Sequence, residues 1–228
     1  MLWSAMFISL KTASAAIAVT FFLGVAAARF VAGLRRRRWK LALDGLFTLP
    51  LVLPPTVAGF FLLYVFGLNR PVGRFFAEWF GFKIAFSWSA TVLAAVTASF
   101  PLMYRAARGA FEQVDPDLVN AARTLGLSEW RIFWRIVLPT ALPGVVAGGV
   151  LAFARGMGEF GATAMIAGNI AGRTQTLPLA IYSAVAAGDM ETAGGYVAVI
   201  AALSFIAVSG INQLLAKEGR AGRRGEPG

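Results

Sequence analysis

Apolar residues along this chain form long runs, which basic stretches or glycine- and proline-rich stretches interrupt. A helix that rises about 1.5 Å per residue needs roughly 20 apolar residues to cross the hydrocarbon layer of a bilayer. The runs that meet this requirement are 12–31, 43–66, 88–105, 142–160 and 196–215. The pattern predicts an all-α fold, a polytopic bundle of about five transmembrane helices within one domain.

Lysine and arginine lie mainly between alternate pairs of runs. Six fall in 29–40, five in 105–135 and four in 217–224, whereas 70–83 holds three and the loop before the last run holds Arg173. The positive-inside rule then places the N-terminus outside and the C-terminus in the cytoplasm. The net charge of +10 is thereby explained by topology beside membrane lipid, and we expect no nucleic-acid partner.

The N-terminal run could be a signal peptide or a retained span, and the C-terminal residues differ in composition from the rest of the chain. Ala26, Ala27 and Ala28 end the first run, as at a signal-peptide cleavage site, but a single preceding lysine, Lys11, makes a poor basic region. We therefore expect the first run to remain as a span, with the transmembrane domain covering 1–215. The charged, glycine-rich tail at 216–228 is expected to be disordered.

Three prolines interrupt the second run. Pro50, Pro54 and Pro55 lack a backbone donor and clash with the preceding turn, so the helix should be kinked or broken. An ordinary kinked span and a span that lines a pathway are both consistent with this pattern. A break at these prolines leaves backbone carbonyl groups without a hydrogen-bond donor in the helix. Within a membrane, such groups are tolerated only where a neighbouring helix or a water-filled cavity satisfies them, so Pro54 and Pro55 are candidate pathway residues.

A polar hairpin is predicted between the third and fourth runs, within 109–139. Asp115 should cap a short helix that has Pro116 at its first position, and Gly126 should end it. Ser128 should cap a second helix with an apolar stripe, made of Trp130, Phe133, Trp134 and Val137. An interfacial helix and a docking unit with small residues at Ala121 and Ala122 remain open as alternatives.

Two charges lie in or near the end of the fourth run. Arg155 and Glu159 are four residues apart and share one helix face, so they can pair. Burying either charge alone at the bilayer centre would cost about 2.5–3.5 kcal/mol. We expect this pair, with Gly158 between them, to belong to a substrate pathway or gate, although a pair that only fixes packing is the alternative.

Several kinds of chemistry are excluded by composition. The chain has no cysteine, no histidine and no phosphate-loop pattern, so we expect no catalytic residue, no metal site and no bound cofactor. An enzyme that uses Glu159 or Asp44 as a base lacks a convergent acidic cluster. A secondary transporter or channel would depend on Glu159 as its intramembrane acid.

The segment 120–139 resembles the cytoplasmic signature of binding-protein-dependent ABC importer permeases. Its matching residues are Ala121, Ala122, Gly126, Ile136, Leu138 and Pro139. The resemblance implies a coupling helix that docks on an ATPase subunit. The implied coupling residues are Asn120, Ala121, Ala122, Arg123, Leu125, Gly126 and Trp130. Asn120 stands where the family usually has glutamate.

Further stretches, including 49–59 and 152–163, resemble the molybdate permeases, which are related to the sulfate and thiosulfate permeases. This resemblance implies a MetI-like type I importer fold and a permease homodimer with its pathway at the interface. It also implies two ATPase subunits that bind ATP and Mg²⁺, and a periplasmic or lipoprotein oxyanion-binding protein. Molybdate, tungstate and sulfate all remain possible cargoes in a bacterial inner membrane.

Overall fold

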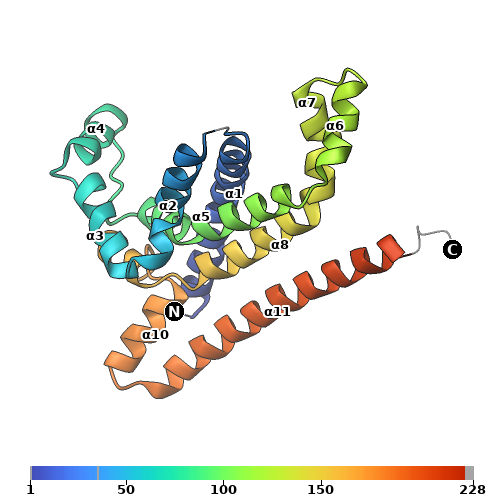
Figure 1. The fold of residues 1–228 in the computed structure, drawn as a ribbon. Coiled ribbons are helices and arrows are strands. Elements are labelled where there is room, and N and C mark those ends of the chain that lie inside the picture. Colours follow the sequence, from blue (N-terminus) through green and yellow to red (C-terminus); the bar gives the residue numbers. More distant parts are fainter. Residues whose placement is uncertain (1, 35, 224–228) are drawn as a thin grey trace.

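The computed structural model describes residues 2–34 and 36–223, which are almost entirely helical. The elements follow in the order α1 (Leu2–Ala32), α2 (Arg37–Val52), α3 (Pro55–Phe66), α4 (Pro71–Phe80), α5 (Trp88–Glu112), α6 (Pro116–Thr124), α7 (Glu129–Ile132), the π-helix η1 (Phe133–Val137), α8 (Leu138–Met157), α9 (Gly161–Ala167), α10 (Leu177–Ala186) and α11 (Met190–Arg223) (Figure 1). Within the described residues, four helices are long and apolar enough to cross a membrane, and the bent pair α2–α3 is a fifth candidate. The predicted all-α bundle is confirmed.

The second predicted span, 43–66, is a broken helix. α2 ends at Val52, α3 begins at Pro55, and the two axes differ in direction by 110°. Pro54 and Pro55 supply no N–H group, so the hydrogen-bond ladder of α2 cannot continue into α3. Pro54 instead becomes the N-cap of α3 and Pro55 its first residue.

Hydroxyl pairs hold α1 against α5. Thr12 and Thr91 lie 2.9 Å apart through their Oγ1 atoms, and Thr20 and Ser99 lie 3.1 Å apart through their hydroxyl oxygens. Both pairs join residues 79 positions apart, so the two helices run in the same direction. The chain between them, which includes α2 and α3, therefore returns toward the end of the molecule where α1 begins.

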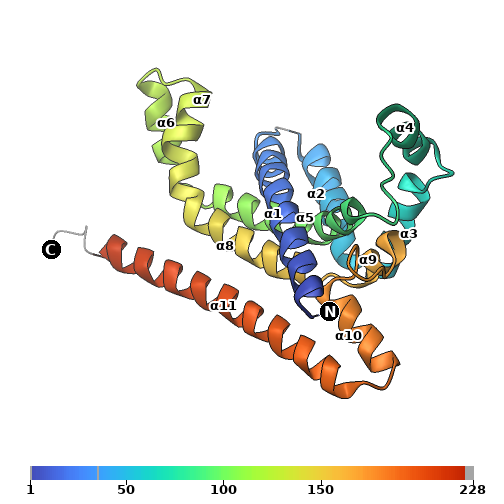
Figure 2. The same cartoon turned by 180° about the vertical axis from the view of Figure 1, so that it is seen from behind.

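Small residues bring α5 and α8 close together along the centre of the molecule, as Figures 1 and 2 show. A Cβ added to Gly148 would lie 2.3 Å from the Cβ of Ala106, and one added to Gly144 would lie 2.8 Å from the Cβ of Ala110. Small residues let helix backbones approach closely in membranes, where packing replaces the hydrophobic effect between helices. This contact fixes the helices on either side of the hairpin.

Helices α4, α9 and α10 were not predicted. They contain 10, 7 and 10 residues respectively, fewer than a membrane span requires. A search for apolar runs of about 20 residues therefore misses them. The predicted span 142–160 also ends early, because α8 stops at Met157.

The last helix is longer at both ends than the predicted span 196–215. α11 begins at Met190 and continues to Arg223. Residues 216–223 are therefore helical, whereas the sequence analysis expected disorder from residue 216. This stretch contains two glycines, which disfavour a helix, but its alanine, lysine, glutamate and arginine residues favour one and it contains no proline. The rest of the predicted tail, 224–228, lies outside the described residues.

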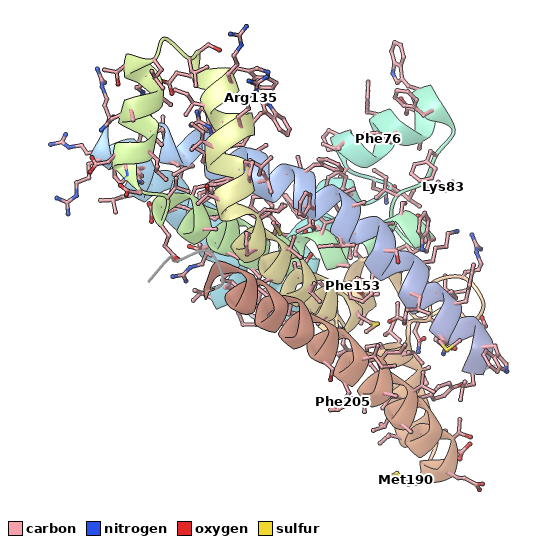
Figure 3. The ribbon with its side chains drawn as sticks, turned by 90° about the vertical axis from the view of Figure 1, so that its right-hand side faces the viewer. Phe76, Lys83, Arg135, Phe153, Met190 and Phe205 are labelled. Carbon is pink, nitrogen blue, oxygen red and sulfur yellow. The ribbon has the colours of Figure 1, made fainter. Side chains whose placement is uncertain are left out.

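The hairpin stands apart from the packed helices. Figure 1 shows α6 and α7 projecting from one end of the molecule, while α10 and its turn into α11 lie at the other. With the side chains drawn, Arg135 in η1 of the hairpin and Met190 at the start of α11 also lie at opposite ends (Figure 3). The hairpin is thus exposed at one end of the helix bundle.

Candidate functional site

The hairpin is built by local capping. Asp115 accepts a hydrogen bond from the N–H of Asp117 at 2.9 Å and caps α6. Gly126 has φ +76°, a left-handed conformation that costs glycine little, and it follows the end of α6. Ser128 accepts a hydrogen bond from the N–H of Arg131 at 3.4 Å and caps α7. The predicted order of helix, glycine and helix is confirmed.

Arg123 joins the two helices of the hairpin. Its Nε donates to Glu129 Oε1 at 2.6 Å and its Nη2 donates to Glu129 Oε2 at 3.2 Å. Its Nη1 donates to Asn120 Oδ1 at 3.1 Å. The hydrogen bond and the negative charge of Glu129 raise the pKa of Arg123 above its ordinary value. Glu129 was missed as a site residue, because its arginine partner lies across a turn.

Most of the predicted coupling residues are exposed on the hairpin, but one of them is buried. Asn120 and Ala121 are exposed, and Leu125 and Trp130 are 81% and 71% exposed. Ala122 is buried, and its carbonyl accepts a hydrogen bond from the N–H of Leu127. The small face predicted at 121–122 is therefore split, with Ala121 available to a partner and Ala122 inside the hairpin.

The predicted apolar stripe of the second helix is divided in the same way. Phe133 is buried, its ring centroid 5.8 Å from that of Phe111, with the guanidinium of Arg29 5.2 Å above it. Trp130 and Trp134 are instead exposed. The four-residue helix α7 passes directly into the π-helix η1, whose wider turn breaks the α-helical spacing assumed in the prediction.

The second candidate site is the ion pair at the end of α8. Arg155 Nη1 lies 2.8 Å from Glu159 Oε2, and the glutamate side chain is 2% exposed against 34% for the arginine. Glu159 Oε1 accepts a hydrogen bond from the N–H of Ala162 at 2.9 Å, in the first turn of α9. Gly158 caps the C-terminus of α8 and is exposed. The pair therefore holds the junction between α8 and α9.

This junction meets the break between α2 and α3. A Cβ on Gly161 would lie 2.8 Å from the Cβ of Pro55, and one on Gly59 would lie 2.7 Å from the Cα of Ala162. Arg155, Glu159, Pro50 and Pro55 line one cavity of ≈ 10 Å³, about the space that a single water molecule needs. The structure brings these predicted residues together and leaves no room beside them for a larger ion.

A polar ladder between α2 and α5 was not predicted. It consists of Lys40 and Asp44 on α2, and of Tyr104, Arg108 and Glu112 on α5. Asp44, which was considered as a base for catalysis, pairs with Arg108 and Tyr104. The spacing of four residues on each helix was visible in the sequence, but nothing in the sequence identified the facing helix.

The family model described as binding-protein-dependent transport system inner membrane component matches residues 5–217. This chain belongs to that family. The molybdenum transport system permease protein ModB of Escherichia coli (strain K12) is 44% identical over 227 residues, which cover 97% of each chain. The sulfate transport system permease protein CysT of the same strain is 36% identical over 79% of this chain and 65% of its own.

A solved inward-facing structure of the MetNI methionine ABC transporter has a similar fold. Its TM-score is 0.75 at 16% identity, with 95% of each chain covered. The MetI-like fold inferred from the sequence is therefore confirmed. Membership of the family makes the chain a multi-pass membrane component of a transport system, and not an enzyme.

Proposed function

We propose that this chain is the permease subunit of an ATP-driven importer of molybdate in the bacterial inner membrane. The observation that carries the proposal is the 44% identity to a molybdenum permease over 97% of both chains. Tungstate is a second cargo of the same charge and shape. A sulfate or thiosulfate permease is the weaker alternative, since the sulfate relative is 36% identical.

The proposed assembly contains two copies of this chain, two ATPase subunits and an oxyanion-binding protein outside the membrane. ATP and Mg²⁺ belong to the ATPase subunits. The exposed face of the hairpin, with Ala121, Leu125 and Trp130, suits docking into a groove on an ATPase. The N-terminus lies outside and the C-terminus in the cytoplasm, in agreement with the basic loops.

The proposed pathway passes the junction of the two broken helices. Pro54, Pro55, Gly158, Arg155 and Glu159 lie at these breaks, where rearrangement of backbone requires the least loss of helical hydrogen bonds. The ≈ 10 Å³ cavity there represents a closed state of the pathway. Opening would separate α3 from α9 and expose the guanidinium of Arg155 to an anion.

Reconstitution of the permease with its ATPase and binding protein in liposomes tests this function. We expect ATP-dependent uptake of radiolabelled molybdate, with unlabelled tungstate competing strongly and sulfate weakly. Stronger competition by sulfate than by tungstate would assign the chain to sulfate transport. Uptake that continues without ATP or without the ATPase subunit would instead indicate a secondary transporter or channel.

A further inference from the structure

The polar ladder joins α2 to the hairpin end of α5 at successive helical turns. Lys40 Nζ lies 3.0 Å from Glu112 Oε1, and Asp44 forms an ion pair with Arg108 and accepts a hydrogen bond from the Tyr104 hydroxyl. Arg108 links the turns, because its Nε donates to Glu112 Oε1 at 3.2 Å and its Nη1 donates to Tyr104 Oη at 3.3 Å. All five side chains have partners within the ladder.

Helix α2 depends on this ladder for its position. Every residue of α2 retains some exposure, and the helix packs mainly against α5. Beyond the polar pairs, the ring of Phe47 contacts Tyr104 and Phe100 at centroid distances of 5.2 Å and 5.6 Å. Tyr104 is 1% exposed, and the Arg108 and Asp44 side chains are 18% and 22% exposed. Ion pairs shielded to this extent are weakened less by salt than those at the surface.

The ladder and the rest of α2 lie between the two candidate sites, which are the hairpin and the ion pair at the end of α8. Glu112 is the last residue of α5, three positions before Asp115, which caps the hairpin. At the other end of α2, Pro50 lines the cavity that also contains Arg155 and Glu159. A continuous path of paired side chains and rigid helix therefore runs from the hairpin to the junction of the broken helices.

We propose that Arg108 is a positioning residue for transport, because it fixes α2 to the hairpin end of α5 and makes the two helices move as one body. A displacement of the hairpin then reaches the α2–α3 break, where the pathway is closed. This inference rests on the proposed function, in which an ATPase displaces the hairpin. A partly buried residue that joins two helices suits this role, since packed elements transmit displacement as rigid units.

Neutralising Arg108 tests the proposal in the complete complex with its ATPase and binding protein. For Arg108→Ala we expect about a tenfold fall in anions transported per ATP hydrolysed, which is in the range of typical coupling between two sites. ATPase content and the rate of ATP hydrolysis should stay at the wild-type level. Arg108→Lys should restore most of the lost transport, because a cation near Asp44 and Glu112 is retained.

Arg105 provides a matched control. It lies on the same helix and lines the same cavity of ≈ 450 Å³ beside the ladder, but it forms no ion pair among the described residues. Arg105→Ala should leave the number of anions per ATP unchanged. A similar fall for both variants would attribute the effect to lost positive charge and overturn the positioning role.

Cross-linking tests the rigidity of the ladder while every ladder residue remains. Gly45 and Gly109 line this cavity, and a Cβ at either position has open space around it. Because the sequence contains no cysteine, Gly45→Cys combined with Gly109→Cys supplies the sole pair of thiols. Joining them with a short thiol-reactive linker should leave ATP-driven uptake unchanged. Uptake that stops on cross-linking and returns when a cleavable linker is cut would show that the ladder opens during transport, contrary to the proposal.

The remaining outcomes separate this inference from the proposed function. If wild-type complex transports and Arg108→Ala matches it in anions per ATP, the positioning role is wrong. A parallel loss of ATPase content would assign Arg108 to docking and also overturn the inference. Absence of ATP-dependent oxyanion uptake in the wild-type complex refutes the proposed function itself.

Discussion

At the scale of single residues, an ion pair across the turn joins the two helices of the hairpin. The sequence has Asn120 where the resembled permeases usually have glutamate, so a charge contact made by that glutamate is absent here. The structure supplies Glu129 as the partner of Arg123 from the neighbouring helix, with Asn120 as an additional acceptor. Arg123 therefore keeps a carboxylate partner although position 120 is neutral.

Moving the carboxylate from position 129 to position 120 tests whether Arg123 needs a carboxylate partner for the hairpin to bind the ATPase subunit. Glu129→Ala should weaken binding of the ATPase subunit by roughly threefold, since exposed ion pairs contribute modestly. Adding Asn120→Glu to Glu129→Ala should restore binding, because a carboxylate then returns near Arg123. Affinity measured by surface plasmon resonance with the purified permease distinguishes these results. Identical affinities for all three proteins would show that the pair does not order the hairpin.

The ion pair of α8 gives an asymmetric prediction. Arg155→Gln leaves the Glu159 charge almost fully buried without its partner, a defect that typically costs about 3–5 kcal/mol. Glu159→Gln leaves the more exposed Arg155 charge and should destabilise less, and the double variant should be more stable than Arg155→Gln alone. Thermal unfolding of the detergent-purified proteins measures this order. Equal midpoints for the two single variants would contradict the assigned pairing.

At the scale of elements, helix ends are determined locally and helix contacts by small residues. Proline and glycine set the boundaries of α3 and α6, as the backbone chemistry of these residues requires. Gly144 and Gly148 let α8 approach α5. The hairpin consequently connects the ends of two closely packed helices.

Gly148→Ala should destabilise the contact between α5 and α8. The added Cβ would meet Ala106 at 2.3 Å, and overpacking of this kind typically costs about 1–3 kcal/mol. Gly109→Ala is the matched control, because a Cβ there has open space and alanine is the better helix former. Thermal unfolding midpoints should fall for the first and stay or rise for the second. A fall of equal size in both would refute the packing argument.

The exposed face of α6 yields a prediction about docking. Ala121→Trp should leave folding intact, since position 121 is exposed, but it should abolish co-purification of the ATPase subunit by steric conflict. Its control is Gln113→Trp, at an exposed position before the hairpin begins. Retained ATPase and transport with Ala121→Trp would place the docking surface elsewhere.

At the scale of the whole molecule, the parallel direction of α1 and α5 bears on the proposed topology. In that topology the bent pair α2–α3 returns the chain across the membrane, and the hairpin and the loop after α1 lie on one side. The turn between α10 and α11 lies at the opposite end of the molecule from the hairpin (Figure 1), and we place it, with α4, on the other side of the membrane. In the proposed orientation, which rests on the positive-inside rule, the hairpin side faces the cytoplasm.

Cysteine labelling tests this arrangement, because the native sequence contains no thiol. Lys83→Cys, after α4, should react with a membrane-impermeant maleimide in cells whose outer membrane has been made permeable. Arg131→Cys, in the hairpin, should react only in inverted inner-membrane vesicles. The reverse pattern would invert the proposed topology and remove the hairpin from the ATPase side.

The sequence by itself determined those features that depend on neighbours along the chain. Apolar run length indicated the spans, and the capping residues Asp115, Gly126 and Ser128 defined the hairpin, because these interactions act within a few residues. The Arg155–Glu159 pair was also visible as two charges one helical turn apart.

Tertiary structure alone decided which helices face one another. The Arg108 pairing with Asp44, the burial of Phe133 beneath Arg29, and the meeting of Pro55 with Gly161 all join distant segments. Periodicity shows that a helix has a polar or apolar face, but the partner of that face follows from packing of the whole chain. The short helices α4, α9 and α10 likewise belong to this arrangement, since each is too short to be recognised as a span.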